Sequence, residues 1–252
     1  METDCWKVEL ADGIARCSMN TPWNMNAMSK DLVYPMAESI KSLMEDSSAR
    51  VIIIRGEGGH FCSGADLSML GENMNPLALS EAMQLANGVI HDLHDGPKPV
   101  IAEVDGYAVG GGLSLALAAD ITYATERVMF MAGWIRIAGV PDLGGSHLLP
   151  ERVGLALAKE LAYTGRVIGA DEALRIGLVN RIVSHETISE EVTELARKLA
   201  RQPTSALTWT KRLLNAGRHS ALQAVMDMEA HIQPLMLLSL EHKQAVARFF
   251  NR

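Results

Sequence analysis

Residues 51–67 read VIIIRGEGGHFCSGADL, and the prediction of the fold starts from them. The apolar run that begins at Val51 is typical of a strand buried on both faces, as the strands of a parallel sheet are. The glycine-rich residues at 58–67 allow a sharp turn and let backbone N–H groups come close to a ligand. The stretch therefore predicts a buried strand over 50–55 that leads into a candidate binding turn.

A second stretch of the same kind follows at 99–120, PVIAEVDGYAVGGGLSLALAAD. It predicts a second buried strand over 99–104 and a glycine turn that opens an apolar helix. The first N–H groups of a helix have no partner within it, and they favour negative charge. Neither turn has the pattern of a dinucleotide-binding or phosphate-binding loop, so a nucleotide phosphate is not the expected ligand. Taken singly, each turn is more often structural than functional.

Short strands and helices alternate up to about residue 186, which predicts an α/β fold with crossover connections. Beyond that point the strand signals stop, so we divide the chain into a main body, 1–186, and a helical C-terminal region, 187–252. The last predicted helix, 220–249, carries more apolar residues than one small region can cover, which favours oligomerisation. A helix packed wholly on its own body is the alternative. The other predicted elements are strands over 6–10, 14–18, 121–125 and 128–130, helices over 29–43, 191–201 and 205–216, and a flexible loop over 71–78.

The composition excludes several classes of protein. The chain has 252 residues, of which 48% are hydrophobic, and its 23 Lys and Arg against 30 Asp and Glu give a net charge of −7. This suits a globular protein, and without a basic run neither a nucleic acid nor an anionic membrane is an expected partner. We expect no signal peptide, because no apolar stretch follows a basic region at the start. No apolar run is long enough to predict a membrane span, and three cysteines do not suggest a disulfide framework. We therefore expect a cytoplasmic protein.

Four motifs together closely resemble the crotonase (enoyl-CoA hydratase/isomerase) superfamily. They are HFCSGADL at 60–67, GGG at 110–112, AADITYAT at 118–125 and IAGVPDLGGSHLLPERVG at 137–154, within a similarity that runs from Trp6 to Phe249. The resemblance implies a spiral core of ββα units, a helical C-terminal region that trimerises, and a homotrimer or a dimer of trimers. It also implies an acyl-CoA thioester as the substrate, with coenzyme A as part of that substrate and no tightly bound cofactor.

The resemblance further implies that the backbone N–H groups of Ala65 and Gly111 form an oxyanion hole around the thioester oxygen. Charge gathers on that oxygen when a proton leaves the neighbouring carbon, and fixed N–H donors stabilise the resulting enolate without reorganising. Because these donors belong to the main chain, a bulky replacement at Gly111 is expected to act by displacing the backbone.

The catalytic carboxylate is the next expectation. Hydratases of this superfamily use two glutamates, whose places hold Ser114 and Trp134 here, so simple hydration is not expected. Asp142 remains, at a position that resembles the single carboxylate of the phenylacetate-pathway ring-epoxide isomerase and of the Δ3,Δ2-enoyl-CoA isomerases. One carboxylate suffices for an isomerase, because it can remove a proton and return it two carbons away. The structural alternative is that Asp142, in Pro-Asp-Leu-Gly-Gly, only makes a turn.

Two other functions remain open. In the related aryl-CoA dehalogenases a tryptophan and an aspartate occupy places matching Trp134 and Asp142, and the aspartate attacks the aromatic ring. Their histidine is not clearly matched, because Asn87 falls at its place and His91 lies one helical turn later. A non-catalytic acyl-CoA-binding protein, with both glutamates lost, is the third possibility. Trp134 is equally well read as a pocket wall or a core aromatic.

The resemblance maps the remaining substrate contacts onto a small set of residues. They are Met25, Ala27, Ser63, Asp66, Leu67, Gly110, Trp134 and Phe249. Trp23 stands where relatives often carry a basic residue near the nucleotide. Three other polar residues, His60, Asp120 and His147, are expected to be structural. The cysteines have no metal-binding spacing, and no histidine and carboxylate cluster is apparent, so no metal is expected.

Overall fold

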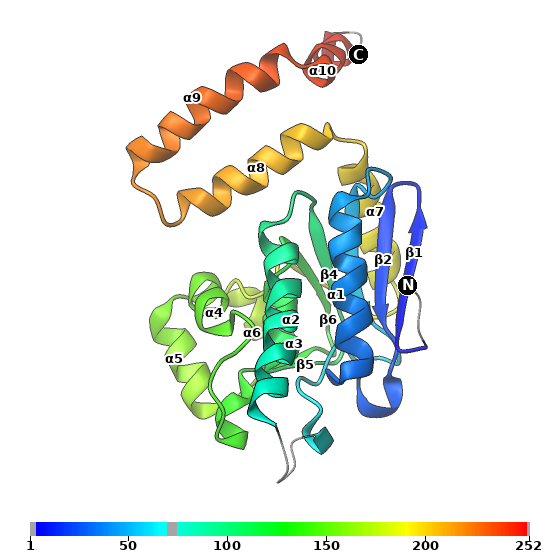
Figure 1. Ribbon diagram of the computed structural model, residues 1–252, viewed down its shortest axis with the longest axis vertical. Helices are drawn as coiled ribbons and strands as arrows, with labels where there is room; N and C mark the ends of the chain where they lie inside the picture. Colours follow the sequence, from blue (N-terminus) through cyan, green and yellow to red (C-terminus); the bar gives the residue numbers. More distant parts are fainter. Residues whose placement is uncertain (1–3, 70–74, 251–252) are drawn as a thin grey trace.

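The computed structural model describes residues 4–69 and 75–250 (Figure 1). Its strands are β1 (Trp6–Ala11), β2 (Ile14–Met19), β3 (Val51–Gly56), β4 (Val100–Val104), β5 (Tyr107–Val109), β6 (Ile121–Thr125), β7 (Met129–Met131), β8 (Val167–Ile168) and β9 (Arg181–Val183). Its α-helices are α1 (Lys30–Glu45), α2 (Pro76–Asp95), α3 (Gly111–Leu117), α4 (Gly145–Val153), α5 (Leu155–Thr164), α6 (Ala170–Arg175), α7 (Ile188–Ala200), α8 (Thr204–Gly217), α9 (Leu222–Leu238) and α10 (Leu240–Phe250). Short 3-10 helices are η1 (Pro22–Asn24), η2 (Leu67–Met69) and η3 (Gly133–Ile137).

The strands form two sheets. Among the described residues, a six-stranded sheet has the order β1-β2-β3-β4-β6-β9 and a three-stranded sheet has the order β5-β7-β8. β1 and β2 form an antiparallel hairpin, and every later neighbour in the larger sheet is parallel. β4 and β6 are each followed at once by a short strand of the smaller sheet, β5 and β7, and then by a helix. The predicted α/β fold of repeated ββα steps is confirmed.

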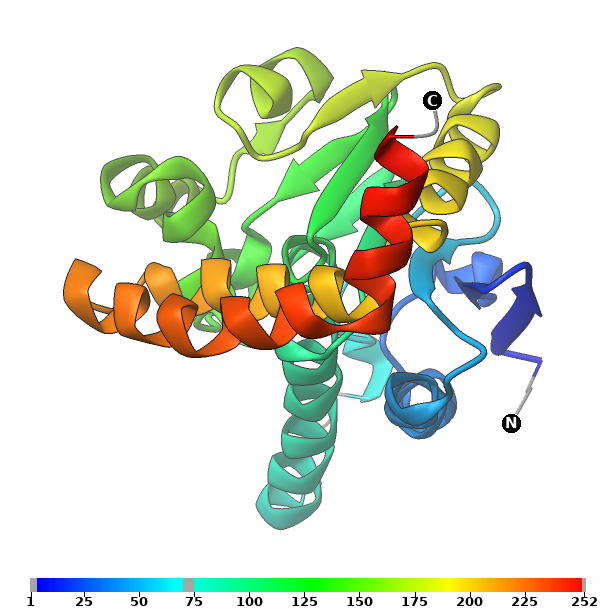
Figure 2. The ribbon, with the colours of Figure 1, turned by 90° about the horizontal axis from the view of Figure 1, so that it is seen from above.

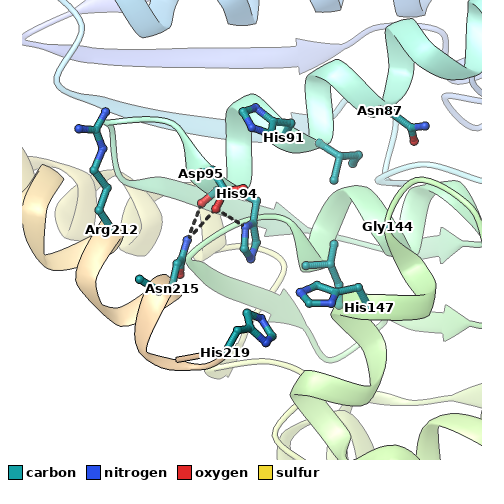
Figure 3. A pocket seen from close by; sticks show the side chains of 12 residues that line it. Asn87, His91, His94, Asp95, Gly144, His147, Arg212, Asn215 and His219 are labelled. Atoms are coloured by element: carbon teal, nitrogen blue, oxygen red, sulfur yellow. Dashed lines mark hydrogen bonds and ion pairs between the residues drawn. The ribbon is translucent and has the colours of Figure 1, made fainter. Parts of the chain in front are cut away.

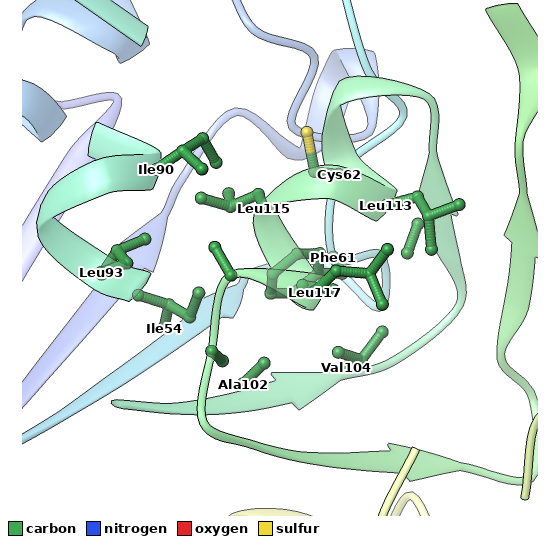
Figure 4. Close-up of a cluster of buried hydrophobic side chains, with 14 of the residues drawn as sticks. Ile54, Phe61, Cys62, Ile90, Leu93, Ala102, Val104, Leu113, Leu115 and Leu117 are labelled. Atoms are coloured by element: carbon green, nitrogen blue, oxygen red, sulfur yellow. The ribbon is translucent and has the colours of Figure 1, made fainter. Parts of the chain in front are cut away.

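Helices cover both faces of the larger sheet. Alternate residues of a strand point to opposite faces. Ile52 and Ile54 of β3 belong to the main core beneath α1 and α2, part of which Figure 4 shows, whereas Val51 and Ile53 pack with Val192 of α7. Full burial of each such side chain contributes about 1.5–3 kcal/mol. The apolar run of β3 is therefore continuous because neither of its faces meets water.

The C-terminal helices differ in two ways from the prediction. α7 packs on the larger sheet in a second apolar cluster, on the face opposite α1 and α2, so the first helix after residue 187 is packed against the main body. The single helix predicted over 220–249 is two helices, because Ser239 is extended (φ −67°, ψ 154°) and its Oγ accepts a hydrogen bond from the N–H of His242. α8 and α9 lie side by side and extend beyond the sheets (Figures 1 and 2). The division of the chain into two domains stays a prediction.

Lys211 connects α8 to the main body. Its buried ammonium group donates hydrogen bonds to the carbonyl oxygens of Leu93 and Lys98, at 2.6 and 3.0 Å, and lies 2.9 Å from Asp120 Oδ2. Asp120 Oδ2 also accepts a hydrogen bond from the N–H of Val100, at 2.7 Å. Asp120 therefore has the structural role expected of it.

Lys211→Met is expected to lower the free energy of unfolding by roughly 2–3 kcal/mol, because it leaves two carbonyl groups and a carboxylate without their cationic partner. Urea unfolding would measure the loss. Lys159→Met, in the exposed part of α5, is the matched control and should change the free energy of unfolding little. Equal stability of the Lys211 variant and the wild type would contradict this role.

Two further expectations, the loop over 71–78 and the absence of a membrane span, can be compared with the structure only for the described residues. Of the predicted loop over 71–78, residues 71–74 lie outside the described residues, whereas α2 begins at Pro76. Within 4–69 and 75–250, no helix combines the length and the apolar character that crossing a bilayer requires.

Candidate active site

The two glycine turns lie against each other. The N–H of Cys62 donates to the carbonyl oxygen of Tyr107, at 2.9 Å, and the N–H of Val109 donates to that of Cys62, at 3.0 Å. A Cβ placed on Gly64 would lie 3.7 Å from the amide nitrogen of Gly111 and 2.7 Å from the carbonyl oxygen of Val109. Gly64 also has a φ of +93°, which side chains disfavour. The close approach of the two turns therefore requires glycine at position 64.

The amide of Ala65 faces away from the neighbouring loop. Met28 and Ala65 form a parallel bridge. The N–H of Met28 donates to the carbonyl oxygen of Gly64, and the N–H of Asp66 donates to the carbonyl oxygen of Met28. Because successive N–H groups point to opposite sides of an extended chain, the N–H of Ala65 points away from Met28. Gly111 is the first residue of α3, so its N–H has no partner within the helix. In the described part of the chain, neither N–H donates a hydrogen bond.

The loop before α1 forms one side of the first turn. The fully buried Asn26 side chain donates to the carbonyl oxygens of Glu57 and His60, at 2.9 and 2.7 Å. The N–H of Ser63 donates to Met25, at 3.0 Å, which brings the predicted coenzyme A contacts Met25 and Ser63 together. Asn26 thus fixes the position of this loop, a structural role that the sequence pattern did not predict for it.

Other predicted contact residues lie in the loop before α1 and at the first glycine turn. Ala27 is buried next to Asn26, and Leu67 is exposed on η2. The Asp66 carboxylate accepts from the N–H and Oγ of Ser68, at 3.0 and 2.6 Å. Asp66 therefore holds its own turn, and Leu67 offers an apolar side chain to the solvent side of that turn.

The carboxylate of Asp142 is held by Trp134. The indole Nε1 of the buried Trp134 donates to Asp142 Oδ1, at 2.8 Å. A Cβ placed on Gly110 would lie 3.6 Å from that same Nε1, so the indole adjoins the second glycine turn. Burial raises the pKa of Asp142, and the hydrogen bond from Trp134 opposes that rise. A half-buried carboxyl group with a raised pKa has the properties of a general acid and base.

The backbone at Asp142 also makes the turn that was the structural alternative. The carbonyl oxygen of Asp142 accepts from the N–H of Gly145, at 2.7 Å, and from Ser114 Oγ, at 2.9 Å. Leu143 and Gly144 both have positive φ, +47° and +73°. The turn therefore uses the main-chain carbonyl group of Asp142, so the side-chain carboxylate can accept the hydrogen bond from Trp134.

Trp134→Phe is expected to raise the pKa of Asp142, because the lost hydrogen bond favours the ionised carboxylate. A reaction that needs this ionised carboxylate then loses rate at a higher pH than in the wild type. The pH dependence of kcat would measure this shift of the acidic limb. An acidic limb at the wild-type position would contradict the assignment of Asp142 as the titrating base.

Several predicted residues lie elsewhere. Phe249 is 73% exposed on α10, at the opposite end of the molecule from η2 (Figure 1), so one chain does not bring it to the other contact residues. The exposed Asn87 and His91 line a separate cavity between α2, α4 and α8 (Figure 3). Trp23 is exposed on η1. The His60 ring stacks on Tyr107, and its Nδ1 lies 3.3 Å from the Tyr107 amide nitrogen, which gives His60 the structural role expected of it.

The expectation that no histidine and carboxylate cluster exists is wrong. His147, Glu151 and His219 bring their ligand atoms within 4.8 Å of one another. His147 lies near the start of α4, as expected, but His219 follows α8 and comes from a distant part of the sequence. Only the spacing of His147 and Glu151 on one helix face was visible in the sequence.

Known proteins resemble this chain along most of its length. The chain matches the family described as enoyl-CoA hydratase/isomerase over residues 9–252. It is 31% identical to the 1,2-epoxyphenylacetyl-CoA isomerase of Escherichia coli, over 94% of this chain and 92% of that protein. It is 35% identical to the 4-chlorobenzoyl coenzyme A dehalogenase-2 of an Arthrobacter species, over 88% of this chain and 82% of that protein. The crystal structure of an enoyl-CoA hydratase from Bacillus anthracis superposes with a TM-score of 0.93 at 29% identity, covering 98% of this chain and 96% of that one.

Proposed function

Because the chain belongs to the enoyl-CoA hydratase/isomerase family, we propose that it is an acyl-CoA isomerase that shifts a double bond or rearranges a ring by proton transfer. The observation that carries this proposal is the hydrogen bond from Trp134 Nε1 to Asp142 Oδ1, at 2.8 Å, beside the second glycine turn. Ser114 and Trp134 offer no carboxylate, so Asp142 is the proposed catalytic acid and base.

In the proposed mechanism, the thioester oxygen accepts hydrogen bonds from the N–H groups of Ala65 and Gly111. The carboxylate of Asp142 removes a proton from one carbon, and the electron pair of the broken C–H bond moves into the enolate. The two N–H groups stabilise the charge on the enolate oxygen. Asp142, now protonated, returns the proton to a carbon two positions away, and the enolate collapses to the rearranged thioester. No net proton is gained or lost.

Coenzyme A is proposed to bind as part of the substrate, with no other tightly bound cofactor. The exposed edge that contains Met25, Ser63 and Leu67 is its proposed site, with Ala27 and Asp66 supporting the loops beneath. Gly110 and Trp134 line the acyl end of that site. The apolar Leu67 and the backbone groups around Ser63 suit a long and flexible thioester arm.

A homotrimer or a dimer of trimers is the proposed assembly. Several large apolar side chains of α9 and α10 are exposed in one chain: Leu222, Met226, Leu235, Leu238, Leu240, Phe249 and Phe250. Contact with further copies would remove these side chains from water. We expect Leu238→Glu to lower the mass measured by sedimentation, whereas Glu229→Gln on the same helix should leave it unchanged. A wild-type chain that sediments as a monomer would contradict the assembly.

Hydrolytic dehalogenation of an aryl-CoA thioester is the second candidate, and the contact between Trp134 and Asp142 also favours it. In that reaction Asp142 Oδ would attack the halogen-bearing carbon, halide would leave, and activated water would cleave the aryl ester. The reaction needs a base for that water. His91, the nearest match in sequence, is exposed and lines the separate cavity.

One set of assays separates the candidates. Unsaturated, ring-epoxide and 4-chlorobenzoyl thioesters of coenzyme A are incubated with the protein in heavy water. Isomerisation predicts rearranged product, with deuterium on the carbon beside the thioester or two positions away wherever the protonated Asp142 exchanges with heavy water before it returns the proton. Dehalogenation predicts release of chloride. Tight thioester binding with no label, no rearrangement and no chloride across the panel would overturn both, in favour of a non-catalytic binding protein.

A further inference from the structure

Four histidines gather around the cavity between α2, α4 and the end of α8 (Figure 3). The cavity has a volume of about 620 Å³, and His91, His94, His147 and His219 all line it. None of the residues assigned to thioester chemistry is part of its lining. The cluster is therefore a separate feature that the proposed reaction does not explain.

Two distances within this cluster match those between the ligand atoms of a metal ion, and all three ligand atoms lie within 4.8 Å of one another. Glu151 Oε1 lies 3.3 Å from His147 Nε2 and 3.1 Å from His219 Nε2. A tetrahedral zinc ion with bonds of about 2.0–2.1 Å to nitrogen and oxygen holds its ligand atoms roughly 3.3 Å apart. Both distances to Glu151 thus correspond to edges of such a tetrahedron.

Three separate constraints hold the ligand atoms in place. His147 and Glu151 lie on one face of α4, one helical turn apart, and Glu151 is largely buried. His219 comes from the segment after α8, and its ring lies 5.0 Å from that of His147. Arg218 forms an ion pair with Glu151 Oε2, which leaves Oε1 to the two imidazoles. A carboxylate held by such an outer partner is typical of metal sites.

We propose that His147, Glu151 and His219 form a binding site for a divalent transition-metal ion of the zinc type. Two neutral imidazoles and one carboxylate are a ligand set for zinc, cobalt or nickel, and not for calcium or magnesium, which prefer oxygen ligands alone. The three protein ligands leave a fourth position open toward the cavity, for water or a small anion. The metal ion would join α4 to the end of α8.

Cobalt binding tests this proposal without any assay of the enzyme. Untagged full-length protein is freed of metal with a chelator and titrated with Co²⁺, whose tetrahedral complexes absorb visible light strongly. We expect one Co²⁺ per chain, a tetrahedral spectrum, and displacement of that ion by Zn²⁺ but not by Mg²⁺. An octahedral spectrum, or binding that Mg²⁺ displaces, would overturn the assignment.

Single variants locate the ion. His219→Asn and Glu151→Gln should each weaken Co²⁺ binding by more than the roughly 10–100-fold that loss of an outer partner costs, and should abolish the tetrahedral spectrum. His91→Asn, which lines the same cavity outside the three ligands, is the matched control and should bind as the wild type does. Unchanged binding in the His219 variant would overturn the site.

Thermal unfolding shows whether each variant is folded and gives a second measurement of metal binding. Zn²⁺ should raise the unfolding temperature of the wild type and of His91→Asn, because a ligand that binds only the folded state stabilises it. The same addition should leave the unfolding temperature of His219→Asn unchanged. A cooperative unfolding transition of that variant would show that it is folded. A shift equal to that of the wild type would overturn the proposal.

Discussion

Replacing Asp142 with asparagine is expected to lower kcat for isomerisation by about 10²–10⁴-fold, the range that a positioned acid and base contributes. The amide has nearly the same shape, and it can still accept the hydrogen bond from Trp134 Nε1. It cannot remove a proton from carbon. The affinity for the thioester, measured with a substrate analogue, should therefore change little while turnover collapses.

Asp171→Asn is the matched control for this substitution, because Asp171 is exposed at the start of α6 and far from the site in the sequence. Its kcat should equal that of the wild type. Deuterium exchange beside the thioester gives a second measurement, which should disappear together with turnover in the Asp142 variant. Turnover at the wild-type rate in Asp142→Asn would rule out this carboxylate as the proton carrier.

Gly64→Ala is expected to lower turnover by about 10²–10³-fold, comparable to the loss of one oxyanion donor, which costs about 2.7–4 kcal/mol of transition-state stabilisation. The added methyl group would lie only 2.7 Å from the carbonyl oxygen of Val109, so the two turns must move apart. Gly111 is less constrained than the sequence suggested. The nearest atoms to a Cβ there are the side-chain ends of Leu143 and Met28, at 3.1 and 3.3 Å.

Gly59→Ala separates displacement of the turns from strain in the backbone. Gly59 has a φ of +80°, close to the +93° of Gly64, but a Cβ there would lie 3.8 Å from the nearest side chain. Both variants therefore carry similar backbone strain, and only Gly64→Ala pushes the two turns apart. Equal kcat values for the two variants, with both folded by circular dichroism, would contradict the role given to the contact between the turns.

Much of the fold could be predicted from local patterns. The run at 51–54 is apolar without a break, as expected of a strand that is covered on both faces. The hairpin at 6–19 alternates apolar and polar residues around a glycine turn. The partner of α7 could not be predicted this way. Val192 and Ala196 mark one apolar face of that helix, but the pattern does not say that the face meets the sheet.

The site shows the same division. The glycine turns and Asp142 were predicted as site residues from their motifs, whereas the hydrogen bond from Trp134 to Asp142 depends on an irregular segment with positive φ at Ala138 and Leu143. No periodic pattern describes such a backbone. His219 reaches α4 only through the packing of α8, so no spacing in the sequence connects it with Glu151.

The pairing of Cys62 with Tyr107 and Val109 has a consequence for how such a protein can evolve. The hydrogen bonds that align the two turns use main-chain atoms alone, so they persist whatever side chains stand at positions 114, 134 and 142. If the proposed function holds, mutations at those three positions would change the reaction while the aligned turns are inherited unchanged. A scaffold of this kind allows chemistry to diversify without a new fold.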